Sequence, residues 1–422
     1  MQTKWLTVSI KELYEGLYDG PHATPSPSDI GPVFLGIKNV TDDGRLDLSD
    51  IRHIAEEDFT TWTRRVEPRA GDLVFTYEAT LNRYAIIPQS FRGCLGRRMA
   101  LIRPDPHKVD VRFLLYYFFT DAWRAVIRKN MLTGATVDRI PLTSFPEFPV
   151  IAPPLPVQQQ IAGILSAYDD LMENNRRRIR ILEEMARSLY REWFIRFRFP
   201  GHEKLKFIAS SHGDIPQDWK VTDLEKVCVE RNGIQTGPFG SQLHEADYSD
   251  EGVPVVMPKN LIGFRIRTEG IARIPEATAD KLSRHRMQSG DIVYGRRGDI
   301  GRRAYLMPHQ IGWFCGTGCL RIRPNSQVVN GWYLFNYLGQ DDVLGIIAGR
   351  AQGVTMPNLN TGVMASVPVK LPPRKLQDDF ARLTFPMAEE HEALTAKTEN
   401  LSRTRDLLLP RLFSGQLRIG AA

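Results

Sequence analysis

The sequence predicts a mixed α/β (α+β) protein: two similar domains separated by two long antiparallel coiled-coil helices, forming a pseudo-two-fold internal repeat. Three observations support this fold class. Apolar residues recur at alternating steps of four and three over five heptads, and the second half of the chain repeats the first. Each half also opens with short apolar runs bounded by glycine, proline and aspartate, which are typical of strands. A sustained heptad seam predicts a long helix that packs along another helix.

The first seam lies between Pro156 and Phe199. At 1.5 Å per residue it spans roughly 50 Å, which is long for the core helix of a small domain and favours a spacer. Asn175 is its only fully polar member, and it is either a tolerated polar residue or a device that fixes helix register. The seam consists of Ile161, Leu165, Tyr168, Met172, Asn175, Ile179, Leu182, Ala186, Leu189 and Trp193.

The second long helix is expected over about residues 375–413. Its alternate seam positions are polar or weakly apolar, so it needs a better partner, and the first helix is one. Pro386 should bend or delay its first turns. A homodimeric coiled coil is the alternative, but the repeat favours antiparallel pairing within one chain, with the domains at opposite ends. The apolar positions, spaced by seven, are Phe380, Met387, Leu394, Leu401 and Leu408.

The repeat keeps a nearly constant offset of about 219 residues over most of each half. It predicts a first domain over 1–155, a first helix over 156–199, a linker over 200–216, a second domain over 217–372, a second helix over 373–415 and a tail over 416–422. Matched pairs include Trp5 and Trp219, Lys38-Asn39 and Lys259-Asn260, Gly71-Asp72 and Gly290-Asp291, Ile102-Arg103-Pro104 and Ile322-Arg323-Pro324, and Phe194 and Phe413.

The composition indicates a cellular compartment but does not identify a function. The net charge of +6, from 55 Lys+Arg against 49 Asp+Glu, permits nucleic-acid binding without demonstrating it. Four cysteines in 422 residues indicate free thiols in a reducing compartment. The chain shows no signal-peptide pattern and no apolar run long enough for a membrane span, so the cytoplasm is expected.

Catalytic and cofactor motifs are missing from the sequence. It contains no G-x-x-x-x-G-K-[S/T] phosphate loop, no H-E-x-x-H, no Cys/His metal cluster and no [N/D]-P-P-[Y/F] segment of amino-methyltransferases. We therefore predict a binding protein without a catalytic centre, metal or bound cofactor.

The candidate binding residues lie in loops that correspond between the two halves. Arginine can read guanine, asparagine and glutamine can read adenine, and tight turns let the backbone approach phosphate. Any one of these arginines, taken alone, is more simply a solvated surface residue. The strand frame repeats while the loops diverge, which suggests two DNA readers of one design with different targets. The candidates are Lys38, Asn39, Thr76, Tyr77, Thr80, Asn82, Arg83, Arg97 and Arg98 in the first half, and Gln235, Thr236, Gly237, Phe239, Ser241, Gln242, Lys259, Asn260, Arg296 and Arg297 in the second.

Over nearly its full length the chain resembles the specificity subunits of type I restriction-modification systems. The segments that carry the resemblance are Tyr18-Asp19-Gly20-Pro21-His22, Leu155-Pro156-Val157-Gln158-Gln159-Gln160-Ile161-Ala162, Leu182-Glu183-Glu184-Met185-Ala186, Thr236-Gly237-Pro238-Phe239-Gly240-Ser241, Gly316-Thr317-Gly318-Cys319-Leu320, Thr355-Met356-Pro357-Asn358-Leu359 and Leu409-Pro410-Arg411-Leu412-Phe413-Ser414-Gly415.

The resemblance implies two target-recognition domains, each reading half of a bipartite double-stranded DNA target, with the paired helices as a ruler. It also implies docking of two modification subunits, which bring S-adenosylmethionine, and of restriction subunits, which bring ATP and magnesium. A non-enzymatic scaffold that joins two protein partners without a DNA role is the alternative, and an enzyme in its own right is a third possibility.

Overall fold

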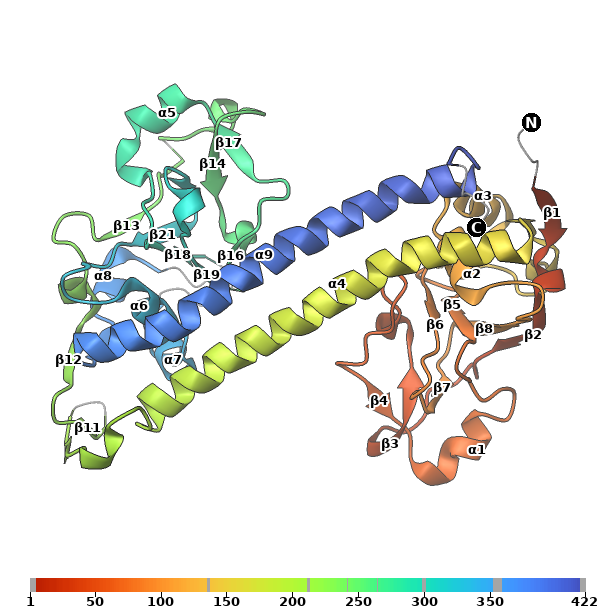
Figure 1. Cartoon of the computed structure of the whole chain (residues 1–422), viewed down its shortest axis with the longest axis horizontal. Helices are drawn as coiled ribbons and strands as arrows, with labels where there is room; N and C mark the ends of the chain where they lie inside the picture. The colour runs from red at the N-terminus through yellow and green to blue at the C-terminus, as the bar shows by residue number, and fades with distance from the viewer. Residues whose placement is uncertain are drawn as a thin grey trace. The chain divides into compact units, whose positions relative to one another are not determined.

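The computed structural model describes residues 5–134, 137–210, 213–240, 242–263, 265–297, 301–351 and 359–417. The chain divides into two compact units: unit 1 comprises Met1–Asn175 with Lys397–Ala422, and unit 2 comprises Arg176–Ala396. Each unit contains one mixed α/β domain and a stretch of both long helices (Figure 1). Candidate residue Ser241 and the segment 355–358 lie outside the described residues.

The unit 1 domain is built from three antiparallel or mixed sheets. The largest has the strand order β2-β8-β5-β6, and the others are β4-β3-β7 and the pair β1-β9. The strands are β1 (Leu6–Ser9), β2 (Tyr14–Asp19), β3 (Ser28–Leu35), β4 (Arg52–His53), β5 (Leu73–Thr76), β6 (Tyr84–Ile86), β7 (Gly93–Leu95), β8 (Met99–Pro104) and β9 (Pro149–Ala152), and the helices are α1 (Phe59–Trp62), α2 (Val111–Phe118) and α3 (Asp121–Asn130).

The unit 2 domain repeats this topology. Its four-stranded sheet has the order β13-β21-β18-β19, beside β17-β14-β20, the pair β12-β22 and two further short pairs. The strands are β10 (Phe207–Ile208), β11 (Ile215–Pro216), β12 (Lys220–Asp223), β13 (Ile234–Thr236), β14 (Val253–Val256), β15 (Leu261–Ile262), β16 (Arg265–Ile266), β17 (Ala272–Ile274), β18 (Ile292–Gly295), β19 (Arg303–Tyr305), β20 (Phe314–Cys315), β21 (Cys319–Ile322) and β22 (Pro368–Leu371), and the helices are α5 (Glu276–Lys281), α6 (Gly331–Tyr337), α7 (Asp341–Arg350) and α8 (Thr361–Ala365).

The strand register pairs equivalent residues in the two domains. Val74 of β5 lies opposite Leu101 of β8, and Val293 of β18 lies opposite Arg321 of β21. One ion pair also recurs in both domains: Arg103 donates to both carboxylate oxygens of Asp72, and Arg323 to both of Asp291, at 2.8 Å in each bond. The prediction of two similar mixed α/β domains is confirmed.

The two long helices run antiparallel within each unit. They are α4 (Leu155–Tyr190), which continues into a π-helical turn over Arg191–Ile195, and α9 (Arg374–Phe413). In unit 1, Asp169 pairs with Arg405 and Asn175 with Thr398; in unit 2, Arg178 pairs with Glu390 and Glu183 with His391. Within each unit, later residues of α4 contact earlier residues of α9, which is the antiparallel order that the internal repeat predicts.

Two details of the helices refine the expectations from sequence. Asn175 is buried, and its Nδ2 donates to Thr398 Oγ1 across the helix pair at 3.2 Å. A buried amide that needs one partner on the facing helix favours a single register, so the bond supports the register interpretation. Pro386 does not delay the second helix, because α9 is helical from Arg374 onward.

None of the helices in the described ranges combines the length and the apolar character that a membrane span requires.

Each domain holds one helix start and one helix end by equivalent contacts. Buried Gln158, near the start of α4, accepts the Asp110 backbone N–H at 3.0 Å, and buried Gln377, near the start of α9, accepts the Asn330 N–H at 2.8 Å. At the other end of each helix, Phe413 stacks on Phe113 of α2, and Phe194 packs edge-on against Tyr333 of α6. These contacts lie within unit 1 for Gln158 and Phe413 and within unit 2 for Gln377 and Phe194.

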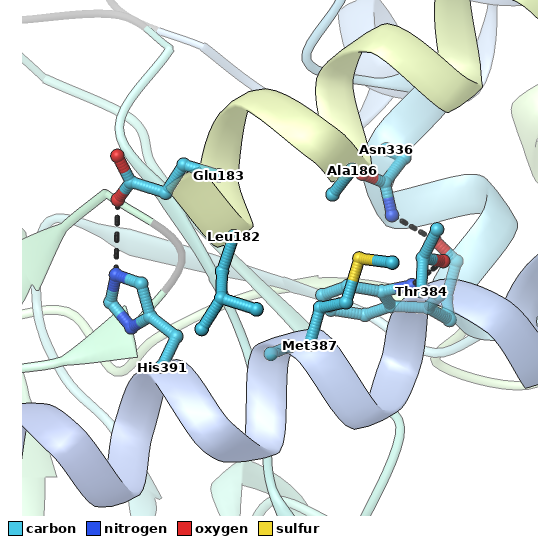
Figure 2. A pocket seen from close by; sticks show the side chains of 9 residues that line it. Leu182, Glu183, Ala186, Asn336, Thr384, Met387 and His391 are labelled. Carbon is cyan, nitrogen blue, oxygen red and sulfur yellow. Dashed lines mark hydrogen bonds and ion pairs between the residues drawn. The ribbon is translucent and has the colours of Figure 1, made fainter. Parts of the chain in front are cut away.

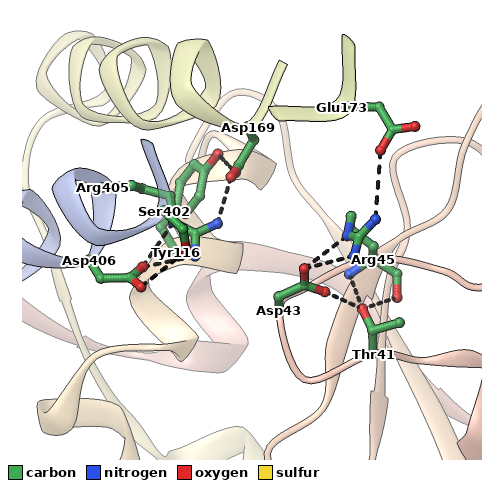
Figure 3. A network of polar contacts seen from close by, with 9 residues as sticks. All are labelled: Thr41, Asp43, Arg45, Tyr116, Asp169, Glu173, Ser402, Arg405 and Asp406. Atoms are coloured by element: carbon green, nitrogen blue, oxygen red, sulfur yellow. Dashed lines mark hydrogen bonds and ion pairs between the residues drawn. The ribbon is translucent and has the colours of Figure 1, made fainter. Parts of the chain in front are cut away.

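The helix–domain junction differs between the units at positions that the repeat makes equivalent. In unit 1, Arg405 donates to Asp169 Oδ1 at 2.6 Å, and Tyr116 OH donates to the other oxygen of that carboxylate (Figure 3). The same positions in unit 2 hold Ala186, Ala388 and Asn336, and these three residues line a small hollow (Figure 2). A polar network in one unit therefore stands where the other unit has small side chains and an unfilled space.

Candidate nucleic-acid interface

In unit 1 the predicted binding loops meet at one end of the four-stranded sheet. β2 and β5 both end where β8 begins. Backbone bonds tie the loops together: Tyr77 N–H donates to Arg98 O at 3.2 Å and Gly20 N–H to Met99 O at 2.8 Å. Gly96 N–H donates to Leu35 O at 2.8 Å, which brings in the segment that carries Lys38.

In unit 2 the equivalent loops meet in the same way. Arg296 N–H donates to Gly318 O at 2.9 Å, Gly237 N–H to Cys319 O at 3.0 Å, and Gly316 N–H to Val256 O at 2.9 Å. Both domains therefore use one backbone frame to gather loops whose side chains differ. A rigid frame with variable loops is the usual arrangement of a recognition surface.

The structure separates the predicted residues by exposure. Lys38, Arg97, Phe239, Gln242, Lys259 and Arg297 are exposed, and Thr80, Asn82, Arg83, Arg98, Gln235 and Thr236 are half-buried. Within the part of the chain that the structure describes, Arg97, Lys259 and Arg297 form no ion pair, whereas Lys38 pairs with Asp50, Arg83 with Asp42 and Arg98 with Glu78. The buried candidates are Asn39, Thr76, Tyr77, Gly237, Asn260 and Arg296.

Two buried candidates, Asn39 and Asn260, have structural roles within their own loops. Asn39 Oδ1 accepts the Gly36 N–H, and its Nδ2 donates to Asp47 O and Asp50 O. Asn260 repeats the pattern with the Met257 N–H and Arg267 O. Each side chain is 2% exposed, so these asparagines close their own loops and cannot reach a base without breaking them.

Thr76, Tyr77 and Arg296 are also too buried to contact a base in this conformation. Thr76 Oγ1 and Tyr77 OH are enclosed and have no hydrogen-bond partner among the described residues. Burial also raises the pKa of the Tyr77 phenol, helped by the nearby Asp19 and Glu78 carboxylates. The guanidinium of Arg296 lies 5.8 Å from the Phe239 ring centroid, so it supports the exposed aromatic residue of the glycine-rich loop.

The unit 1 loops carry backbone conformations that residues other than glycine rarely adopt. Ala79, Asn82 and Arg98 have φ of 70°, 63° and 72°. The repeat equivalent of Arg98 is Gly318, with φ of 85°. Left-handed backbone at non-glycine residues is costly and concentrates at functional sites, so retaining arginine at position 98 favours a role for its side chain.

A cluster of hydrogen-bonded polar side chains in unit 2 was not predicted from the sequence. Arg321, 2% exposed, donates through Nη2 to Gln235 Oε1 at 3.0 Å and to Asn232 O at 2.6 Å. Arg284 donates to Gln242 Oε1 at 3.2 Å and, through Nε, to His285 Nε2 at 3.0 Å. Burial, together with Arg284 and Arg321, lowers the pKa of His285 to about 4, so the ring is neutral and can accept this bond. Comparison of Arg321 with its repeat equivalent Leu101 would have pointed to it.

Among the described residues, no group of three His, Cys, Asp or Glu side chains could hold a metal ion. The four cysteines are buried free thiols. Burial raises the pKa of Cys94, Cys228 and Cys315 to about 12, so these thiols are poor nucleophiles.

Comparisons with known proteins find relatives that cover most of the chain. The chain is 25% identical over 371 residues to the type I restriction enzyme MjaIX specificity subunit of Methanocaldococcus jannaschii, covering 87% of this chain and 82% of that protein. It is 23% identical over 424 residues to the putative type I restriction enzyme MjaX specificity subunit of the same organism, covering 98% and 94%.

A crystal structure of a type I restriction-modification system S subunit from M. genitalium has the same fold, with a TM-score of 0.62 at 17% identity over 97% of this chain and 96% of that one. The family model for the type I restriction modification DNA specificity domain matches residues 45–184 and again 216–398, once in each half of the repeat. The chain belongs to the family of type I restriction-modification DNA specificity proteins.

Proposed function

We propose that the chain is the sequence-reading, non-catalytic subunit of a type I restriction-modification complex, and that each unit reads one half of a bipartite DNA target. Two modification subunits would dock on it and supply S-adenosylmethionine and methyl transfer. Restriction subunits would supply ATP-dependent, magnesium-dependent chemistry. The chain itself would bind no cofactor and would work in the cytoplasm.

One observation carries the proposal. Corresponding loops meet at the same sheet end in both units, held by equivalent backbone bonds, while their side chains differ. The exposed residues there include unpaired cations that suit phosphate, namely Arg97, Lys259 and Arg297 among the described residues, and amides that suit base edges, such as Gln242. Two domains with the same frame but different loop side chains are suited to a DNA target whose two half-sites differ in sequence.

Domain exchange tests the proposal in the assembled complex. The chain is expressed with its modification subunit, and the methylated motif is read by sequencing the host genome. Replacing residues 217–372 with the matching domain of another family member should change one half of the motif and leave the other half intact. If the unaltered complex methylates no bipartite motif, or if both halves change together, the proposal is wrong. The purified chain alone should transfer no methyl group from S-adenosylmethionine.

The Gly237→Ala substitution should impair the unit 2 half-site. A Cβ at Gly237 would lie 2.0 Å from Gly316 O, so the loop would have to separate from the loop before β21. We expect methylation at the cognate site to fall by about tenfold or more. The control is Gly240→Ala in the same loop, where a Cβ meets nothing within 4 Å. Equal effects of the two substitutions would contradict the close-approach argument.

A further inference from the structure

One cross-strand row distinguishes the two sheets. In unit 1 the row is Tyr18, Leu101, Val74 and Ala85; in unit 2 it is Gln235, Arg321, Val293 and Ala304. The last two positions are apolar in both units. Only the first two change, and they change together from an aromatic–aliphatic pair to an amide–guanidinium pair.

Burying the Arg321 guanidinium at this position costs folding free energy. It is 2% exposed, and its Nε and Nη1 are buried without a hydrogen-bond partner among the described residues. The nearest compensating charge is Asp291, whose carboxylate is 3.8 Å from Nη1 and already bonds Arg323. Leucine fills the equivalent space in unit 1, so the sheet does not require a cation here. Replacing buried charges by apolar side chains is often neutral or stabilising, so stability does not explain this arginine.

Among the described residues, the side chain that accepts a hydrogen bond from Arg321 is that of the candidate Gln235. Because a guanidinium only donates, the atom facing it must be the amide oxygen, which fixes the amide orientation. The NH2 end of Gln235 then has no partner among the described residues and keeps both of its N–H donors. Gln242 shows the same arrangement with Arg284, whose Nη2 donates to Gln242 Oε1.

We infer that Arg321 is a specificity-determining positioning residue: it holds Gln235 with its amide N–H donors available to an acceptor on a base edge in the unit 2 half-site. Purine N7, guanine O6 and thymine O4 are the acceptors of this class in the major groove. The inference rests on the proposed function. It adds that base discrimination in unit 2 depends on a buried residue that itself never contacts DNA.

The test compares single and double substitutions in the chain assembled with its modification subunit. Gln235→Ala should relax the motif at one base pair of the unit 2 half-site, with discrimination falling by about tenfold or more. Arg321→Leu, which installs the unit 1 residue, should relax the same base pair. The double variant should be no more relaxed than Gln235→Ala alone, because both changes remove one interaction.

Val293→Ala is the matched control. Val293 is fully buried on β18, directly opposite Arg321, so its truncation weakens the same sheet without touching Gln235. It should lower methylation of all sites uniformly and leave the motif unchanged. An unchanged motif in Gln235→Ala or in Arg321→Leu overturns the inference, as does relaxation at two different base pairs. These outcomes leave the bipartite motif of the unaltered complex in place, so they are distinct from failure of the proposed function.

Discussion

Asp291→Asn is expected to lower the free energy of unfolding of unit 2 by about 3–5 kcal/mol, because it leaves buried positive charge uncompensated. Asp291 is 1% exposed and is the carboxylate partner of two arginines. Arg323 bonds both of its oxygens, and Arg321, which is 2% exposed, lies 3.8 Å away. The neutral amide would also direct N–H donors at N–H donors. Arg321 cannot turn toward water, so the cost stays in the folded state.

The repeat supplies the control, Asp72→Asn in unit 1. Asp72 is similarly buried and accepts the same two guanidinium bonds from Arg103, but Arg103 is its one arginine side-chain partner among the described residues, and leucine stands where unit 2 has Arg321. The side chain of Arg103 is 20% exposed and can reorient into solvent, so we expect a smaller loss of about 2 kcal/mol. Hydrogen exchange of β18 and β5 amides measures each unit separately, which a single unfolding curve of a two-unit chain does not. Equal losses in the two units would mean that Asp291 does not compensate Arg321.

The strand frame and the helices were predictable because each rests on a pattern within the sequence. Heptad spacing needs no knowledge of tertiary structure, and the residues of both seams are buried or half-buried as the spacing requires. The repeat further relates Asp72 to Asp291 and Gln158 to Gln377, and these pairs make equivalent contacts. A constant offset therefore carried three-dimensional information.

The roles of individual loop residues were not predictable in the same way. Asn39 and Asn260 recur at matched positions, and recurrence together with an amide side chain suggested base reading. Their amides instead satisfy backbone groups within their own loops, which is a tertiary feature that residue type does not reveal. The opposite error concerns Arg321, which lies inside a strand and outside every loop. Its role depends on which residue the neighbouring strand places opposite it, and that requires the register.

Arg405→Ala is expected to lower the free energy of unfolding of unit 1 by about 2 kcal/mol, because it leaves the Asp169 carboxylate without its cation. The Arg405 side chain is 15% exposed and that of Asp169 is 35% exposed, so solvent relieves part of the cost. The control is Arg178→Ala, which removes an exposed ion pair between α4 and α9 in unit 2. Its pair with Glu390 has side chains 51% and 44% exposed and should contribute no more than about 0.5 kcal/mol.

The double variant Asp169→Ala/Arg405→Ala tests the same pair further, since alanines occupy both equivalent positions in unit 2. They are Ala388 and Ala186, the latter labelled in Figure 2. Removing both charges abolishes the unpaired carboxylate and leaves a small hollow, with Tyr116 OH free to bond water. An unpaired partly buried charge costs more than a small solvent-reachable hollow, so the double variant should be more stable than Arg405→Ala alone. Hydrogen exchange of α2 amides in the four members of the cycle measures the coupling. If the double variant loses the sum of the two single losses, Asp169 and Arg405 act independently, and the network of Figure 3 does not hold the helices to the unit 1 domain.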